Sequence, residues 1–418
     1  MSKLSVKKLI YDWNKLGSGK FKPKKIEFDD ETLRDGLQSP SIIDPPIEQK
    51  LKILHLMEDL GIDKADIGLP ASGERAKQDI LQIAKEIYDN KMKISPSCAV
   101  RTMVKDVQAL IEVSDKLGKP IEADMFVGSS PIRQYAEDWN LDKLLKFTEE
   151  AVSYAIKNKI PVMYVTEDTT RADPKIVQKL YTLAIECGAH RVCVCDTVGH
   201  STPAGAYNLI RFVKKVVDKT NLPDGQAGKK VKIDWHGHRD RALDVANCMA
   251  AIEAGATRVH GTALGIGERC GNASMDLLLV NFKLMGWINN DLSKLAEYCQ
   301  TVSEAVGVPI PHNYPVVGMD AFRTVSGIHA AAIIKAEEKG EKELADLVYS
   351  GVPAGMFGLS QKIEIGFMSG VSNVIYWLKK RNIQPEKNLV DKIFNFAKSS
   401  NRILTDEEIM ELVDTKYW

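Results

Sequence analysis

The stretch VKIDWHGHRDRALDVANCMAAIEAGATRVHGTALG (231–265) contains one complete repeat of the predicted fold. A β-rich run over residues 231–238 is followed by apolar residues at helical spacing, which end at Gly255, a residue type that often stops a helix. A second β-rich run covers residues 258–264. The stretch therefore predicts strand, helix and strand in succession, the unit from which parallel sheets are built.

The same alternation extends over residues 25–290 and gives eight such units. The β-rich runs cover residues 25–32, 64–69, 94–100, 122–128, 161–168, 191–197, 231–238 and 258–264. Eight strands, each followed by a helix, predict a closed (β/α)8 TIM barrel. An open doubly wound sheet is the alternative, but no Gly-x-Gly-x-x-Gly turn follows the first run, so its dinucleotide-binding form lacks support.

The alternation stops near residue 290. Residues 292–306 and 325–339 have helical patterns, VPIPHNYP (308–315) is a proline-rich connector, and residues 389–413 predict two short helices. We therefore expect an N-terminal segment (1–24), a catalytic TIM-barrel domain (25–290) and mainly helical C-terminal subdomains (291–418) that serve as lid and dimerisation element.

Composition narrows the class of protein. The chain has 56 basic and 56 acidic residues, so no overall field attracts nucleic acid or an anionic membrane. We find no apolar run long enough to cross a bilayer and no secretory signal, so a cytoplasmic protein with small-molecule partners is expected. The seven cysteines are scattered without a Cys-x-x-Cys pair and predict reduced, mostly buried thiols.

Polar residues end several of the predicted strands, where the active site of a TIM barrel lies. His236 and His238 share one face of the seventh run because side chains alternate along a strand, and Asp35 follows the first run. Two imidazoles and a carboxylate form a common ligand set for a divalent cation. The other candidates at strand ends are Arg34, Gln38, Asp66, Ser129, Arg133, Glu167, Asp168, Asp196 and Thr197.

Three long motifs resemble the signatures of one enzyme family. They are DETLRDGLQ (30–38), HGHRDRALDVANCMAAIEAGA (236–256) and VHGTALGIGERCGNAS (259–274). Together they resemble the 2-isopropylmalate, homocitrate and citramalate synthases of the DRE-TIM metallolyase superfamily, most closely a 2-isopropylmalate synthase without the C-terminal regulatory domain. The chain departs from the usual H-x-H-N-D-x-G-x-A pattern at Arg239, Ala242 and Asp244, which weakens the assignment of substrate more than that of reaction.

The resemblance implies roles for individual residues. It assigns a divalent cation (Zn, Mn or Mg) to Asp35, His236 and His238, with Asn272 as a nearby fourth contact. It assigns the oxo acid and its developing oxyanion to Arg34 and Thr197, and acid/base work to Glu167. Gln38, Asp66 and Arg133 are expected to bind substrate. His329 and Tyr349, in VSGIH and YSGVPAGMFG, resemble the acid/base pair of a synthase lid, so Cys270 is expected to be an incidental buried thiol rather than the catalytic cysteine of a lyase.

The implied reaction is an acyl transfer in which the acyl group becomes an alkyl group. Acetyl-CoA condenses with a 2-oxo acid and the CoA thioester is hydrolysed. We favour 2-oxoisovalerate as acceptor, giving 2-isopropylmalate for leucine biosynthesis, with Leu69, Pro70 and Val100 as an apolar wall. Arg101 and Arg133 would permit a second carboxylate, so pyruvate, 2-oxoglutarate and oxaloacetate (citramalate, homocitrate and citrate synthases) stay open. A homodimer with shared active sites is expected, and a non-catalytic relative that binds metal and oxo acid is the alternative of another class.

Overall fold

The computed structural model describes residues 9–15, 21–223, 230–340 and 342–414 of the chain. These residues form two compact units, one from Phe21 to Pro309 and one that starts at Ile310. Parts of the predicted N-terminal segment, residues 1–8 and 16–20, lie outside the described residues. The predicted boundary at residue 290 lies ahead of α10 (Leu295–Val306), which packs against α1 within the first unit.

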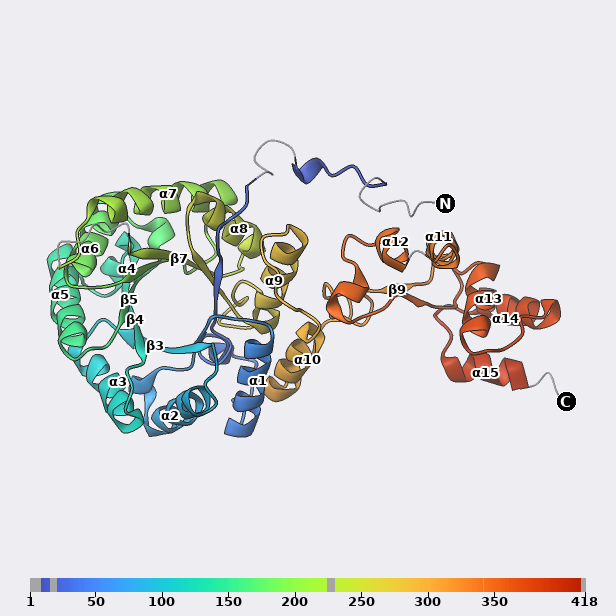
Figure 1. Cartoon of the computed structure of the whole chain (residues 1–418), viewed down its shortest axis with the longest axis horizontal. Coiled ribbons are helices and arrows are strands. Elements are labelled where there is room, and N and C mark those ends of the chain that lie inside the picture. The colour runs from blue at the N-terminus through green and yellow to red at the C-terminus, as the bar shows by residue number, and fades with distance from the viewer. Residues whose placement is uncertain (1–8, 16–20, 224–229, 341, 415–418) are drawn as a thin grey trace. The chain divides into compact units, whose positions relative to one another are not determined.

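The first unit is a closed barrel of eight parallel strands in sequential order (Figure 1). The strands are β1 (Glu27–Asp30), β2 (Lys64–Asp66), β3 (Ser95–Arg101), β4 (Glu122–Gly128), β5 (Val162–Glu167), β6 (Arg191–Asp196), β7 (Lys232–Gly237) and β8 (Arg258–Gly261). The barrel closes where Phe28 of β1 pairs with Val259 of β8. The predicted TIM barrel is confirmed, and each of the eight β-rich runs overlaps one strand, although β3 extends one residue past its run, to Arg101.

Helices cover the outside of the barrel. They are α1 (Ile47–Asp59), α2 (Glu74–Asp89), α3 (Val104–Leu117), the short α4 (Pro131–Ala136), α5 (Leu141–Lys157), α6 (Pro174–Glu186), α7 (Pro203–Lys219), α8 (Asp244–Ala254) and α9 (Met275–Leu284). Local sequence sets their ends: the Asn140 side chain accepts a hydrogen bond from Lys143 N at the start of α5. Gly255, with a φ of 121°, ends α8 as predicted.

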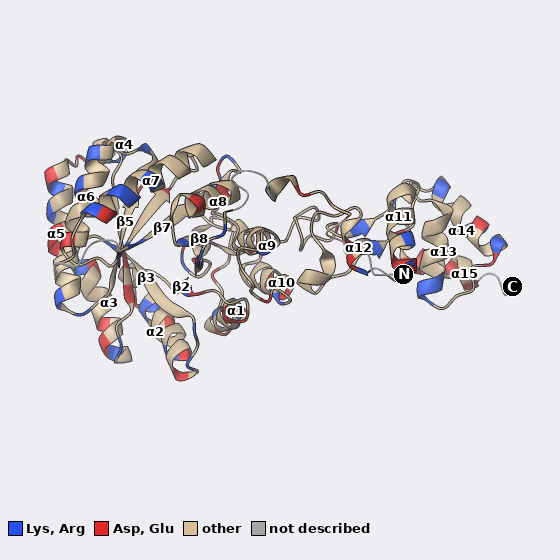
Figure 2. Ribbon diagram, turned by 45° about the horizontal axis from the view of Figure 1, so that its top comes forward, with Lys and Arg blue, Asp and Glu red and all other residues tan. Residues whose placement is uncertain are grey.

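Charged residues of both signs are interspersed along these outer helices (Figure 2). This mixture agrees with the equal numbers of basic and acidic residues in the sequence. None of the described helices combines the length and the apolar character that a membrane span requires.

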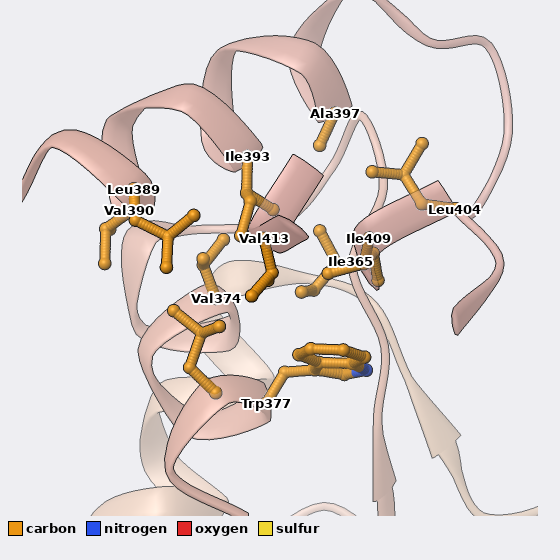
Figure 3. Packing of buried hydrophobic residues seen from close by; sticks show 11 residues of the cluster. Ile365, Val374, Trp377, Leu389, Val390, Ile393, Ala397, Leu404, Ile409 and Val413 are labelled. Carbon is orange, nitrogen blue, oxygen red and sulfur yellow. The ribbon is translucent and has the colours of Figure 1, made fainter. Parts of the chain in front are cut away.

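The second unit is mainly helical, as predicted. It contains α11 (Gly327–Glu338), α12 (Lys342–Leu347), α13 (Val371–Lys380), α14 (Lys387–Ser399) and α15 (Asp406–Asp414). The sequence did not predict its two-residue parallel strands, β9 (Arg323–Thr324) and β10 (Lys362–Ile363). Helices α13 to α15 enclose a buried apolar cluster around Trp377, Ile393 and Ile409 (Figure 3), and Trp377 Nε1 donates to Asp406 Oδ1 at 3.0 Å.

Candidate metal centre and active site

A cavity of about 290 Å³ opens at the carboxyl ends of the barrel strands. Eight predicted site residues line it: Arg34, Asp35, Gln38, Arg133, Glu167, Thr197, His236 and His238. Asp66 and Asn272 join them through hydrogen bonds to Arg34 and Asp35. The structure therefore brings ten of the twelve predicted residues together.

The turn after β1 presents Arg34 and Asp35 to this cavity. The Glu31 carbonyl accepts hydrogen bonds from Arg34 N at 3.1 Å and from Gly36 N at 3.0 Å, which fold the chain into a tight loop. Asp35 is 3% exposed. Although burial opposes ionisation, the neighbouring Arg34 lowers the pKa of Asp35 below its ordinary value, so the carboxylate is charged at neutral pH.

Asp35, His236 and His238 form a ligand set with room for a cation. Asp35 Oδ2 lies 3.7 Å from His236 Nε2 and 3.8 Å from His238 Nε2. These gaps are too wide for hydrogen bonds, whereas a cation with bonds of about 2.1 Å would fit between the atoms. Burial and His236 lower the pKa of His238 to about 4, which leaves a neutral imidazole able to bind metal. The donor set therefore fits a divalent cation.

The opposite side of His236 offers a second group of possible ligands, Glu31 and His260. Glu31 lies 2.8 Å from His236 Nδ1 and 2.9 Å from His260 Nδ1. Because these are direct contacts between side chains, they leave no space for an ion. The space that a cation could occupy therefore lies on the Nε2 side of His236, next to Asp35.

Asn272 reaches this site from the loop after β8. Its Nδ2 donates to Asp35 Oδ2 at 2.8 Å, while its Oδ1 is buried and accepts no hydrogen bond from the described residues. A Cβ at Gly267 would lie 2.0 Å from that oxygen, so a glycine is needed there. Rotation of the amide would present the oxygen to the site, which keeps the predicted fourth contact sterically available.

Arg34 is held by three carboxylates. Its Nε donates to Asp66 Oδ2 at 2.6 Å, Nη2 donates to Glu31 at 3.1 Å, and Nη1 lies 3.5 Å from Asp35. Burial raises the pKa of Asp66 to about 6, although Arg34 opposes this shift. Asp66, predicted to bind substrate, has its carboxylate against Arg34 and fixes the direction of the guanidinium.

Glu167 and Arg133 lie on the other side of the cavity. Arg133 Nε is 3.8 Å from Glu167 Oε1, and Arg133 Nη1 is 2.9 Å from Glu137. Burial raises the pKa of Glu167 and Arg133 opposes this, so the carboxyl group is shifted toward the range useful for proton transfer. The Thr197 hydroxyl accepts a hydrogen bond from Asp168 N at 2.8 Å.

His329 and Tyr349 belong to the second unit. Their rings stack with centroids 4.1 Å apart and an angle of 27° between the planes. Both residues are exposed. The two rings are therefore neighbours, and their role as an acid/base pair stays a prediction.

Two expectations about neighbouring residues are wrong. Cys270, expected to be buried, is exposed on the loop after β8. The apolar wall consists of Ala99, Phe126, Met163, Val165, Cys193 and Cys195, and does not include Leu69, Pro70 or Val100. Ala99 lines the cavity, and the adjacent Val100 points to the opposite face of β3.

Arg101, which the sequence offered as a partner for a second substrate carboxylate, binds Asp106 instead. Its guanidinium donates to the two carboxylate oxygens of Asp106 at 2.7 and 3.0 Å.

Sequence reasoning missed the buried polar residues beneath the site. Glu31 and His260 line the cavity, and Asp234 accepts hydrogen bonds from His260 at 3.0 Å and Arg258 at 2.6 Å. A signal was present, because Asp234 and His236 alternate on β7, with His238 directly after its end, and Arg258 and His260 alternate on β8.

A larger cavity, of about 1240 Å³, lies in the second unit. Several of the charged residues that line it form ion pairs with one another. Arg323 lies 2.8 Å from Glu364, and Arg381 lies 2.6 Å from Asp406. It contains none of the predicted site residues.

Comparisons with known proteins identify the family and the fold of the chain. Residues 25–302 match the family model described as HMGL-like. The chain is 32% identical over 397 residues to homocitrate synthase AksA of Methanopyrus kandleri, covering 94% of this chain and 92% of that protein. It is 31% identical over 402 residues to 2-isopropylmalate synthase of Sulfurisphaera tokodaii, covering 94% and 97%. The HMG-CoA lyase structure from Bacillus subtilis has the same fold, with a TM-score of 0.56 and 22% identity over 69% of this chain and 96% of that one.

Proposed function

Since the chain belongs to the HMGL-like family, as the sequence motifs predicted, we propose that it is a metal-dependent acyltransferase of the Claisen type. In the proposed reaction the methyl carbon of acetyl-CoA adds to the ketone of a 2-oxo acid, and the thioester is then hydrolysed. The observation that carries the proposal is the convergence of Asp35, His236 and His238 with Arg34 and Glu167 in one cavity.

The proposed cation would be held by Asp35, His236 and His238, with Asn272 beside them. When bound, a divalent cation supplies Lewis-acid polarisation of a ketone. Arg34 adds positive charge next to the oxygen that gains negative charge. Its contacts with Asp66 and Glu31 fix it before the reaction begins, and a preorganised donor of this kind contributes roughly 100- to 1000-fold in rate.

Proton removal from the acetyl methyl group needs a base. Glu167 stands at the cavity wall with a raised pKa, and His329 and Tyr349 form a stacked pair in the second unit. We assign proton transfer to the His329 and Tyr349 pair, with Glu167 tuning it. We further propose that the pair acts on the barrel of a second subunit in a homodimer.

The favoured acceptor is a branched apolar oxo acid, 2-oxoisovalerate. One wall of the cavity is formed by Met163, Val165 and Cys195, which suit an apolar side chain. Arg133, which could bind a second carboxylate, is already near Glu137 and Glu167. The relatives include both homocitrate and 2-isopropylmalate synthases, so pyruvate, 2-oxoglutarate and oxaloacetate are the acceptors against which 2-oxoisovalerate must be tested.

The test is release of CoA thiol from acetyl-CoA in the presence of each of these four oxo acids. We expect the largest kcat/KM with 2-oxoisovalerate, and no release from the His236→Ala variant. Thiol release with none of the four acids, from folded protein supplied with Zn²⁺, Mn²⁺ or Mg²⁺, would instead favour the non-catalytic relative.

A further inference from the structure

Glu31 contacts both His236, a candidate metal ligand, and the neighbouring Arg34. Its side chain is 5% exposed, and its two oxygens face different partners. Oε2 lies 2.8 Å from His236 Nδ1. Oε1 accepts hydrogen bonds from Arg34 Nη2 at 3.1 Å and from His260 Nδ1 at 2.9 Å. One buried carboxylate thus contacts three groups around the site.

His260 holds the Glu31 carboxylate from the interior of the barrel. It is 2% exposed, and its second nitrogen, Nε2, lies 3.0 Å from Asp234 Oδ2. Ionised carboxylates only accept hydrogen bonds, so both ring nitrogens of His260 act as donors. Asp234 is itself held by Arg191 and Arg258. The chain of contacts therefore runs from the barrel interior through His260 and Glu31 to His236.

The two candidate histidine ligands, His236 and His238, differ in the contacts that their Nδ1 atoms make. The carboxylate at His236 Nδ1 favours the tautomer whose Nε2 is free, and Nε2 is the atom that faces Asp35. His238 Nδ1 is buried and has no hydrogen-bond partner among the described residues. Only the ring of His236, of these two, is oriented by a second side chain.

We propose that Glu31 and His260 are positioning residues for the cation site. Glu31 sets the tautomer and ring orientation of His236 and aligns Arg34 with it, while His260 holds Glu31 in place. The inference rests on the proposed function, because it assumes that Asp35, His236 and His238 bind a divalent cation. Partners of this kind typically change metal affinity about 10- to 100-fold.

The experiment measures Zn²⁺ affinity of the full chain by competition with a chromophoric chelator, so it does not depend on turnover. Glu31→Gln keeps the size of the side chain but presents an amide N–H to one of its partners. We expect it to bind Zn²⁺ about 10- to 100-fold more weakly than wild type. We also expect a shifted visible spectrum after Co²⁺ substitution, because the ligand geometry changes.

Two substitutions of His260 separate positioning from general stability. His260→Asn retains a donor near the position of Nδ1 and should keep Zn²⁺ affinity within about threefold of wild type, whereas His260→Gln retains the donor to Asp234, loses the one to Glu31, and should bind about tenfold more weakly. Thr148→Val is the matched control. It removes the buried 2.6 Å hydrogen bond to Tyr164, away from the site, and should not alter affinity.

The outcomes are distinguishable. If wild type binds no divalent cation, the proposed metal chemistry fails and the positioning role fails with it. If wild type binds Zn²⁺ and Glu31→Gln binds it equally well with an unchanged Co²⁺ spectrum, the inference is wrong while the proposed function stands. Should Glu31→Gln fail to fold, equal affinity of His260→Asn and His260→Gln would overturn the inference.

Discussion

Replacing Asp30 by asparagine should stabilise the barrel relative to wild type, by an amount that grows as the pH rises. Asp30 is completely buried on β1, where its carboxylate accepts a hydrogen bond from Thr32 N at 2.9 Å and another from the Tyr298 hydroxyl. Burial raises the pKa of Asp30 from 3.8 to about 7 despite these two donors. Asparagine has nearly the same shape and can keep both contacts, but it carries no charge to desolvate.

The magnitude follows from the linkage between protonation and folding. Between pH 3.8 and 7 the folded wild type retains a proton on Asp30 that the unfolded chain has lost, so stability falls as pH rises. The slope is about 1.4 kcal/mol per pH unit, which gives about 3 kcal/mol between pH 5 and pH 7. Above pH 7 the loss is complete. Asp30→Asn lacks this term, so its stability relative to wild type should increase by that amount over the same range.

Urea unfolding at pH 5, 6, 7 and 8, followed by circular dichroism, would measure this difference, provided that the dependence on urea is equal in both proteins. Tyr298→Phe is the companion variant. Loss of its hydroxyl removes a donor from the ionised carboxylate, so the pH dependence should extend to higher pH than in wild type. A difference between Asp30→Asn and wild type that stays constant from pH 5 to pH 8 would refute the reasoning.

Three further predictions test the proposed chemistry. Chelation should abolish thiol release reversibly, and His238→Ala should abolish it with the fold intact; full activity of metal-free protein would contradict the mechanism. Cys270→Ala should remain active, whereas a loss as large as that of His236→Ala without unfolding would favour lyase chemistry. Equal amounts of His236→Ala and His329→Ala, mixed with subunit exchange, should recover about a quarter of wild-type activity if each site combines two subunits. No recovery after verified exchange would eliminate shared sites.

The alternation of β-rich and amphipathic helical segments was sufficient to predict the barrel, although two strands are largely polar within their own bounds, EFDD in β1 and KAD in β2. The pattern predicted the ends of the strands less accurately. The run predicted over residues 258–264 ends as a strand at Gly261, because the chain turns at Leu264, where φ is 57°. The strands β9 and β10 have two residues each, too few to show a periodicity.

The candidate site could be predicted where metal-binding residue types stand at alternate positions of a predicted strand. His236 and His238 are two residues apart at the end of one predicted β-rich run, so their shared face follows from the sequence. Glu31 stands in the same motif as Arg34, but only its distances to two histidines show what it contacts. Such contacts join strands that are distant in sequence, which a pattern within one strand cannot reveal.

Buried charged residues and buried apolar residues both line the barrel interior. The polar residues include Asp234 of β7, His260 of β8, Asp124 of β4 and Glu31, which directly follows β1, whereas β5 and β6 contribute Met163 and Cys195. TIM-barrel interiors are usually filled by branched apolar residues, so the buried charged residues have to be stabilised by their own ion pairs. That requirement explains why Glu31, Asp234 and His260 are linked in series instead of exposed to water.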